Sequence, residues 1–173
     1  MGAGNQQGRL PARQKYLYYY IAGFVDGEGS FSVSLKPHAN MKYGWAVDPV
    51  FQVYQHRKNA GILEIIRDTL KCGYIKPKSP RSDVMVYIVD NRRTLVEKIV
   101  PFFDRHKLLS SKYEDYLKFR EILERMERKE HLTPDGLLEI VRIAVSMNDH
   151  GKRRTYTYED VERTLREQLG TSR

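Results

Sequence analysis

The stretch IAGFVDGEG, from Ile21 to Gly29, ends a long apolar run near the start of this chain. From Leu17 to Val25 every residue is apolar, aromatic or glycine, so a helix here has no polar face and must be covered on all sides. Gly23 and Gly27 lie on one face of that helix, where the lack of side chains lets another backbone approach closely. The sequence therefore predicts a homodimer whose subunits meet at Gly23, Phe24 and Gly27.

A carboxylate follows this glycine face. Glu28 lies just beyond the predicted crossing, so a dimer brings two Glu28 side chains together near the free carbonyl groups of the last helical turn. Like charges at such a distance repel unless a divalent cation lies between them. We expect Mg²⁺ to be held by Glu28 and the Gly27 carbonyl group, with Mn²⁺ or Ca²⁺ as substitutes in binding. The alternative is a buried helix that ends at glycines beside a solvated acid.

The nine residues resemble the LAGLIDADG signature of the homing endonucleases. Ala22, Gly23, Asp26 and Gly29 are identical to that signature, and Glu28 stands where the family has its last acid. The resemblance implies an α+β fold, an αββαββα saddle of antiparallel strands with C-terminal helices, whose concave face lies on DNA. It also implies an intron-encoded, site-specific double-strand DNA endonuclease that acts in intron homing. Such an enzyme cuts a long pseudo-palindromic target as a homodimer, by metal-dependent phosphodiester hydrolysis, and leaves short 3′ overhangs.

Length and composition fit one compact domain with a polyanionic partner. We assign residues 14–170 to a single domain, and residues 1–13, rich in Gly and Gln, to a disordered leader. Thirty Lys and Arg against 22 Asp and Glu give a net charge of +8, which favours double-stranded DNA as partner. Cys72 is the only cysteine, so we expect a reducing intracellular compartment, cytoplasm or organelle matrix, and no secretion. No apolar segment is long enough to cross a bilayer.

After Gly29 the hydrophobic pattern changes from helical to strand periodicity. Each predicted strand alternates between apolar and polar residues, which gives the sheet one side for a core and one polar side. The expected elements are strands over residues 30–36 and 46–56, a helix over 60–71 stopped near Gly73, strands over 74–78 and 84–90, and a helix over 92–100.

The polar side of the predicted sheet is suited to a DNA major groove. Its hydroxyl, amide and cationic side chains can exchange hydrogen bonds with base edges, and the groove admits a β-ribbon. No acid occupies residues 30–36, 52–56 or 76–78, whereas a face turned to water usually mixes both signs. A half-solvated antiparallel sheet is the competing interpretation. The residues expected to contact DNA are Ser30, Ser32, Ser34, Lys36, His38, Gln52, Tyr54, His56, Lys76, Lys78 and Arg81.

Two further catalytic residues follow from the resemblance. The stretch PFFDRHKLLSSKYEDYLKF, residues 101–119, is similar to a Pro-aromatic turn and a helix opened by a lysine in this family. This similarity assigns Lys112 the basic active-site role, with Lys107 as the alternative. The same matching in FQVYQ gives Gln55 the role of orienting active-site water. Alternation places Gln55 on the inner face, where a hydrogen-bonded core glutamine is the alternative.

The C-terminal third is expected to be helical and to cover the convex side of the sheet. Helix-capping signals lie at Ser111 to Glu114, Thr133 to Pro134 and Thr157 to Asp160. Between the last two helices we expect a phosphate-binding turn, which the family often has, made of Lys152, Arg153 and Arg154.

Two other functions are compatible with the sequence. An RNA-binding maturase would use the same saddle to help an intron fold, with intron RNA as the less favoured partner. The third hypothesis is a catalytically inactive DNA-binding module. The acid at position 28 argues against this last hypothesis, because an unused carboxylate cluster costs stability without a metal.

Overall fold

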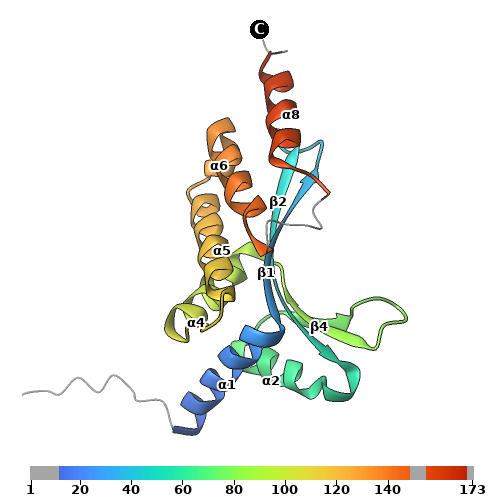
Figure 1. Cartoon of the computed structure of the whole chain (residues 1–173), viewed down its shortest axis with the longest axis vertical. Helices are drawn as coiled ribbons and strands as arrows, with labels where there is room; N and C mark the ends of the chain where they lie inside the picture. Colours follow the sequence, from blue (N-terminus) through green and yellow to red (C-terminus); the bar gives the residue numbers. More distant parts are fainter. Residues whose placement is uncertain (1–11, 149–154, 171–173) are drawn as a thin grey trace, which may run out of the picture.

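The computed structural model describes residues 12–148 and 155–170, and its elements follow the expected order αββαββα (Figure 1). Helix α1 begins at Ala12, so Ala12 and Arg13 are helical although the predicted leader covers residues 1–13. The helix extends past the N-terminal end of the apolar run. The elements are α1 (Ala12–Glu28), β1 (Gly29–Pro37), β2 (Trp45–His56), α2 (Gly61–Leu70), β3 (Tyr74–Pro77), β4 (Val84–Val89), α3 (Arg92–Thr94), α4 (Val100–Arg105), α5 (Lys112–Glu127), α6 (Pro134–Val145) and α8 (Tyr158–Gly170).

The four strands form one antiparallel sheet in the order β1-β2-β4-β3. The hairpin β1-β2 is in register from Gly29 opposite Val53 to Pro37 opposite Trp45. The second hairpin joins the first through β2 and β4, where Phe51 lies opposite Val89. The predicted α+β fold and all four predicted strands are confirmed.

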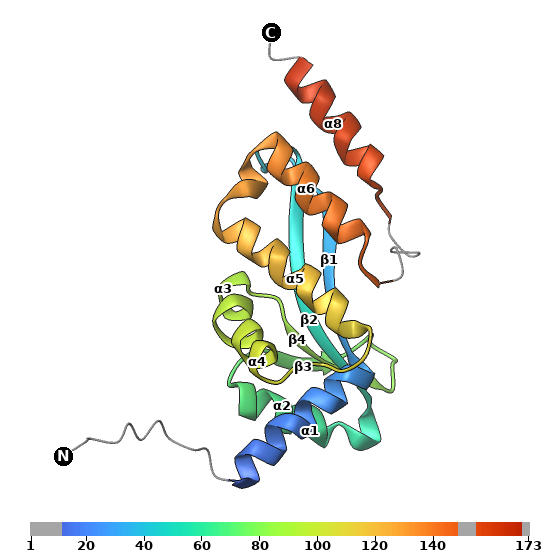
Figure 2. The same cartoon turned by 60° about the vertical axis from the view of Figure 1, so that its left-hand side comes forward.

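The helices α1 to α6 lie on one side of the sheet, and no described helix covers the opposite face (Figures 1 and 2). The core between sheet and helices is rich in aromatic rings: Phe31 of β1 stacks on Phe51 of β2, with ring centroids 5.0 Å apart, and packs edge-on against Phe103 and Tyr116. All four side chains are fully buried. This packing fixes the orientation of the sheet, so its polar side must face away from the helices.

A second apolar cluster closes the far end of the molecule, where α8 lies beyond α6 (Figure 2). Val161 and Leu165 of α8 are buried there against α6 and the end of the β1-β2 hairpin. The cluster consists of Leu35, Trp45, Leu137, Val141, Val161 and Leu165.

Helix α1 is covered on one side only. Ile21 and Val25 are fully buried, but Tyr16, Tyr19 and Tyr20 are 72%, 53% and 57% exposed. The prediction of a helix buried all round is therefore wrong for the single chain, because this chain supplies packing partners for one face alone.

Within the described residues, no helix combines the length and the apolar character that a membrane crossing requires.

The helix predicted over residues 92–100 continues to Arg105. A π-helical turn, Leu95–Ile99, joins α3 to α4, and the N–H of Val100 donates to the carbonyl of Leu95. Pro101 has no N–H for a normal helical bond, and the wider turn just before it accommodates the proline within the helix. The expected Pro-aromatic turn is therefore helical.

Of the predicted helix caps, the one at Ser111 is wrong and those at Thr133 and Thr157 are confirmed. Ser111 makes no side-chain cap, because Ser110 accepts the N–H of Lys112 at 3.2 Å instead. The residue that ends α2 is Lys71, which is left-handed with φ 53° and lies two residues before Gly73. Gly73 is left-handed as well, with φ 74°, and a Cβ atom there would lie 2.5 Å from the Ile88 carbonyl oxygen. The caps expected at the starts of α6 and α8 are both formed.

Candidate active site

The end of α1 is a sharp bend that presents Glu28 to solvent. α1 ends at Glu28, and β1 begins at the next residue, Gly29, with no loop between them. A Cβ atom at Gly29 would lie 2.5 Å from Cγ1 and 2.7 Å from the carbonyl oxygen of Val25, so glycine is required at this bend. Val25 is fully buried and anchors the bend on the core, which leaves the Glu28 carboxylate exposed next to the Gly27 carbonyl group.

Lys112 reaches this bend from the first turn of α5, as predicted for its place in the helix. Its Nζ atom donates hydrogen bonds to the carbonyl oxygens of Val25, at 3.1 Å, and Gly27, at 3.2 Å. The structure thus brings together two of the predicted site residues, Lys112 and Gly27. The alternative lysine, Lys107, has its Nζ over the ring of Tyr113, 6.0 Å from the centroid.

The charge of Lys112 lies among three carboxylates. Burial lowers the pKa of Lys112, and the negative charges of Asp26, Glu28 and Asp115 oppose that effect without cancelling it. The ammonium group is therefore partly desolvated. A cation in such surroundings acts on a nearby negative charge more strongly than it would in water.

Asp26 is a site residue to which the sequence analysis gave no role. Its Oδ2 accepts the N–H groups of Leu109 and Ser110, both at 3.0 Å, and its Oδ1 accepts the Ser110 hydroxyl at 2.6 Å. Burial would raise the pKa of Asp26, but the hydrogen bonds from Ser110 and Leu109 and the charge of Lys112 lower it overall. One feature of the sequence could have indicated this role. Asp26 follows directly after an apolar helical run, and a carboxylate in such surroundings needs hydrogen-bond donors.

Gln55 lies at the end of β2 near the bend. It is two residues beyond Val53, the partner of Gly29, and shares the inner side of the sheet with Val53. The side chain is half-buried, and its Oε1 accepts the N–H of His56 at 2.6 Å. No hydrogen bond joins Gln55 to Glu28 or Lys112 among the described contacts.

The uncovered face of the sheet carries the predicted polar residues. Ser30, Ser32 and Ser34 alternate with buried residues along β1, and Ser30 lies opposite Gln52 of β2. The hydroxyl of Tyr54 donates to Oε1 of Gln52 at 2.7 Å. These side chains share the outer face with Val50, which lies opposite Ser32, and with Val86 and Ile88 of β4, so the surface is polar with apolar residues between.

Cations border this surface at the second hairpin. Lys76 lies on β3 over the ring of Tyr74, and Lys78 follows β3 with its Nζ 5.5 Å from the ring centroid of Tyr54. Arg81 is exposed in the turn between β3 and β4. His56 and His38 are exposed at the ends of β2 and β1, and Lys152, Arg153 and Arg154 lie outside the described residues.

The polar face also holds an acid. Asp48 of β2 lies opposite Ser34, and its Oδ2 is 2.9 Å from Nζ of Lys36. Lys36 is therefore ion-paired, although both side chains are substantially exposed. The predicted absence of acids holds for residues 30–36, 52–56 and 76–78. It fails for the sheet face as a whole, because β2 pairs with β1 as far as Trp45 and so places Asp48 on the same face.

The exposed side of α1 carries a stripe of glycine and tyrosine residues, made of Tyr16, Tyr20, Gly23 and Gly27. A Cβ atom at Gly23 or at Gly27 would meet no atom within 4 Å, so packing inside the chain requires neither glycine. Tyr16 and Tyr20 continue the same side of the helix at helical spacing. Phe24 is half-buried, stacks on Tyr20 and also packs against the core.

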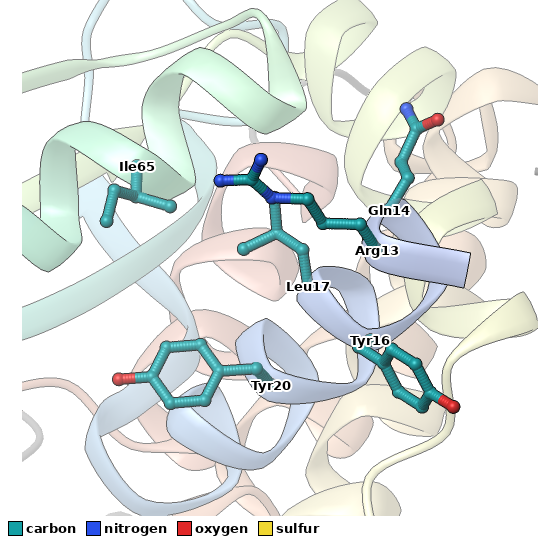
Figure 3. Close-up of a pocket in the computed structure, with 6 residues that line it drawn as sticks. All are labelled: Arg13, Gln14, Tyr16, Leu17, Tyr20 and Ile65. Carbon is teal, nitrogen blue, oxygen red and sulfur yellow. The ribbon is translucent and has the colours of Figure 1, made fainter. Parts of the chain in front are cut away.

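An apolar pocket lies beside this stripe, between α1 and α2 (Figure 3). Leu17 and Tyr20 of α1 and Ile65 of α2 line it, together with the side chains of Arg13, Gln14 and Tyr16. Ile65 is 46% exposed although it is a large aliphatic side chain. The stripe and the pocket together make an apolar surface that a single chain leaves uncovered.

The bend offers ligands of the kind that Mg²⁺ accepts. The Glu28 carboxylate and the Gly27 carbonyl group supply hard oxygen donors, and Mg²⁺ needs only one or two carboxylates beside water and phosphate. Within the described residues, no three His, Cys, Asp or Glu side chains gather as a metal site. One chain thus supplies one carboxylate and one carbonyl oxygen, which is a donor set that Mg²⁺ accepts.

Known proteins match both the sequence and the fold. The family model of the LAGLIDADG endonuclease matches residues 21–123. DNA endonuclease I-CeuI of Chlamydomonas moewusii is 34% identical over 65% of this chain and 53% of its own length, and homing endonuclease I-ApeII of Aeropyrum pernix is 32% identical over 68% and 69%. The structure of the archaeal intron-encoded homing endonuclease I-Vdi141I complexed with DNA has a TM-score of 0.83 and 34% identity, over 91% of this chain and 99% of that one.

The match covers the bend and the sheet but not all of the longer relatives. The chain spans about half of I-CeuI and between 24% and 28% of three fungal relatives. The matched residues 21–123 include the bend at Glu28, all four strands and Lys112. On this match, and on a fold shared with solved homing endonucleases, the chain belongs to the LAGLIDADG endonuclease family.

Proposed function

We propose that this protein is a site-specific DNA endonuclease that cuts both strands of a long pseudo-palindromic target as a homodimer and leaves short 3′ overhangs. The observation that carries the proposal is the bend at the end of α1, where the exposed Glu28 carboxylate and the Lys112 ammonium group flank the Gly27 carbonyl. This group of side chains lies directly beside an uncovered polar sheet face. Acid, cation and binding surface are therefore adjacent.

The uncovered surface of α1 supports the homodimer. Gly23 and Gly27 leave open space, and Tyr16, Tyr20 and Ile65 expose apolar area to water around them. A second copy of α1 crossing at these glycines would cover that area and bring two Glu28 side chains together. A symmetric pair with one catalytic group from each chain is suited to cutting two strands of a near-symmetric duplex.

In the proposed reaction, each residue of the bend has a separate task. Glu28 and the Gly27 carbonyl group would hold Mg²⁺, or Mn²⁺ or Ca²⁺ in its place, and the bound ion supplies Lewis-acid charge to the phosphate and to the attacking water. Lys112 offsets negative charge that builds on the phosphate in the transition state. Gln55, at the adjacent end of β2, orients water.

The sheet face binds the duplex in this proposal. The serines of β1, together with Gln52 and Tyr54, present donors and acceptors to base edges, while Lys76 and Lys78 lie where phosphates would follow the second hairpin. Arg81, His38 and His56 extend this surface at the strand ends, and the turn with Lys152, Arg153 and Arg154 adds phosphate contacts. The family relative I-Vdi141I, which was solved in complex with DNA, supports this mode of binding.

The test is cleavage of the duplex made by joining the two exon sequences on either side of the intron that carries the gene, because an intron-encoded endonuclease cuts the site into which its intron inserts. We expect the wild-type protein to cut this duplex with Mg²⁺, and Glu28→Gln to lower the rate on the order of 10³-fold, comparable to the loss of a strong transition-state contact. Glu159→Gln is the matched control, because Glu159 is also exposed but lies on α8 at the opposite end (Figure 1).

Equal cleavage by wild type and Glu28→Gln would remove Glu28 from the mechanism. Binding without nicking at any Mg²⁺ or Mn²⁺ concentration would favour an inactive DNA-binding module. If the protein stimulates splicing of its intron and does not cut DNA, the maturase hypothesis replaces the endonuclease. We also propose a reducing compartment, cytoplasm or organelle matrix, for this activity, because Cys72 has no second cysteine with which to pair.

A further inference from the structure

Two carboxylates, two residues apart at the end of α1, have opposite surroundings. Glu28 is exposed, whereas Asp26 is half-buried and both of its oxygens accept hydrogen bonds. Its donors come from Leu109 and Ser110, more than 80 residues further along the chain. Asp26 therefore fastens a distant loop to the end of α1.

The fastened loop leads directly into the helix that carries Lys112. The Ser110 hydroxyl donates to Asp26 at 2.6 Å and accepts the N–H of Lys112 at 3.2 Å. Lys112 then donates from Nζ to the carbonyl oxygens of Val25 and Gly27 on α1. The contacts form a closed ring, in which α1 holds the start of α5 through Asp26 and α5 returns to α1 through Lys112.

This ring matters because a lysine side chain is long and flexible. The position of its Nζ atom depends on where the helix that bears it begins, and that start is set here by the hydrogen bonds to Asp26. We propose that Asp26 is a positioning residue for DNA cleavage, which holds Leu109 and Ser110 and so keeps Nζ of Lys112 at the carbonyl group of Gly27. The proposal rests on the endonuclease function proposed above.

A purely structural role of Asp26 predicts a different outcome. Asp104 provides the comparison, because its Oδ1 also joins two helices, accepting the Tyr116 hydroxyl at 2.7 Å and Nη1 of Arg120 at 3.0 Å. Asp104 has no hydrogen bond to the loop that precedes α5 among the described contacts. Loss of Asp104 therefore removes a carboxylate contact to α5 while the loop before α5 stays fastened to Asp26, so it measures what such a contact contributes without the ring.

The test is a double-mutant cycle on the single-turnover cleavage rate, with Asp26→Ala, Lys112→Met and the double variant. We expect Asp26→Ala to slow cleavage about 10- to 100-fold, since a misplaced catalytic group costs on that order. Target affinity, measured with Ca²⁺ in place of Mg²⁺, should change less than about threefold. The double variant should be no slower than Lys112→Met alone, whereas Asp104→Ala and Lys112→Met should be additive.

A second measurement needs no DNA. Hydrogen exchange at the amides of Leu109 and Ser110 should be faster in Asp26→Ala and unchanged in Asp104→Ala. Should Asp26→Ala fail to fold, Ser110→Ala interrupts the same ring at an exposed hydroxyl and should also be non-additive with Lys112→Met. Asp26→Asn keeps an acceptor oxygen and should recover part of the rate.

The outcomes separate this inference from the function on which it rests. If the wild-type protein cuts its target and the effects of Asp26→Ala and Lys112→Met are additive, Asp26 is a structural anchor only. The same conclusion follows if Asp26→Ala affects affinity and leaves the cleavage rate unchanged. A wild-type protein that cuts no target overturns the endonuclease proposal, whatever the amide exchange shows.

Discussion

The two ends of this molecule treat their apolar residues differently. At the α8 end, Val161 and Leu165 are buried against α6 and the β1-β2 hairpin, so a single chain completes that cluster. At the α1 end, the inner face of the helix is equally well buried at Ile21 and Val25, but Tyr16 and Tyr20 remain more than half exposed.

The difference between the two ends separates apolar residues that are buried when one chain folds from apolar residues that stay exposed on the folded chain. An apolar surface that its own chain does not cover, next to glycines that its own packing does not require, is typical of an interface. Burial alone explains the residues of the α8 end. The exposed tyrosines and the glycines on the outer side of α1 fit the proposed dimer, in which a second copy of the helix would cover them.

The largest effect is expected from a side chain placed in the proposed crossing. Gly23→Leu should fold normally, because a Cβ atom there meets nothing within 4 Å and leucine favours helix over glycine. In a dimer the two leucines would collide, at roughly 1–3 kcal/mol each, so association should weaken on the order of 100-fold. Sedimentation at micromolar concentration should show single chains, and double-strand cleavage should be lost.

Gly170→Leu is the control for this change, since Gly170 also has open space around its Cβ position and lies on α8. It should leave assembly and cleavage unchanged. A wild-type protein that sediments as a monomer with and without DNA would contradict the dimer itself.

A large effect on folding alone is expected at the other end. Leu165 is 2% exposed, so Leu165→Ala should lower the free energy of unfolding by about 2–5 kcal/mol through lost burial and a cavity. Urea denaturation measures this change. Once corrected for the folded fraction, dimer affinity should equal that of the wild type, and a weaker dimer would mean that the two ends are coupled.

The smallest effect concerns the cap of α8. Hydrogen bonds from the N–H and hydroxyl of Thr157 lower the pKa of Asp160 from its ordinary 3.8. A depressed pKa in the folded state stabilises the protein above the unfolded value and loses that contribution as the pH falls through the folded value. The urea midpoint of Asp160→Asn should therefore lie below that of the wild type at pH 6, and the gap should narrow as the pH falls below 3.8.

Glu159→Gln removes a neighbouring exposed carboxylate that is not part of the cap, and it should leave the midpoint at pH 6 unchanged. A gap between wild type and Asp160→Asn that stays the same size at every pH would assign the effect to the shape of the side chain and not to its charge.

Patterns that repeat along the chain predicted their elements well. The alternation after Gly29 gave β1 and β2 to within a residue at each end, since one buried face allows a single register. The spacing of Thr157 and Asp160 predicted a formed capping box, because both partners lie within one turn. The signature at residues 21–29 located the bend and Glu28 together.

Predictions that rest on a single residue were less accurate where a neighbouring residue could make the same hydrogen bond or adopt the same backbone conformation. Ser110 replaced Ser111 at the start of α5, because Asp26 holds Ser110 in place. Pro101 suggested a helix end, yet a π-helical turn before it lets the helix continue. Lys71 ends α2 in a left-handed conformation two residues before Gly73, which is left-handed as well.

The sequence by itself determined the elements, the apolar helix and the acid at its end, because periodicity and local hydrogen bonding act over a few residues. Only the tertiary structure decided which side of α1 stays open and which lysine reaches the Gly27 carbonyl. It also showed that Asp26 binds a loop more than 80 residues away. Such contacts depend on how the layers pack, and the spacing of residues along the chain does not contain that information.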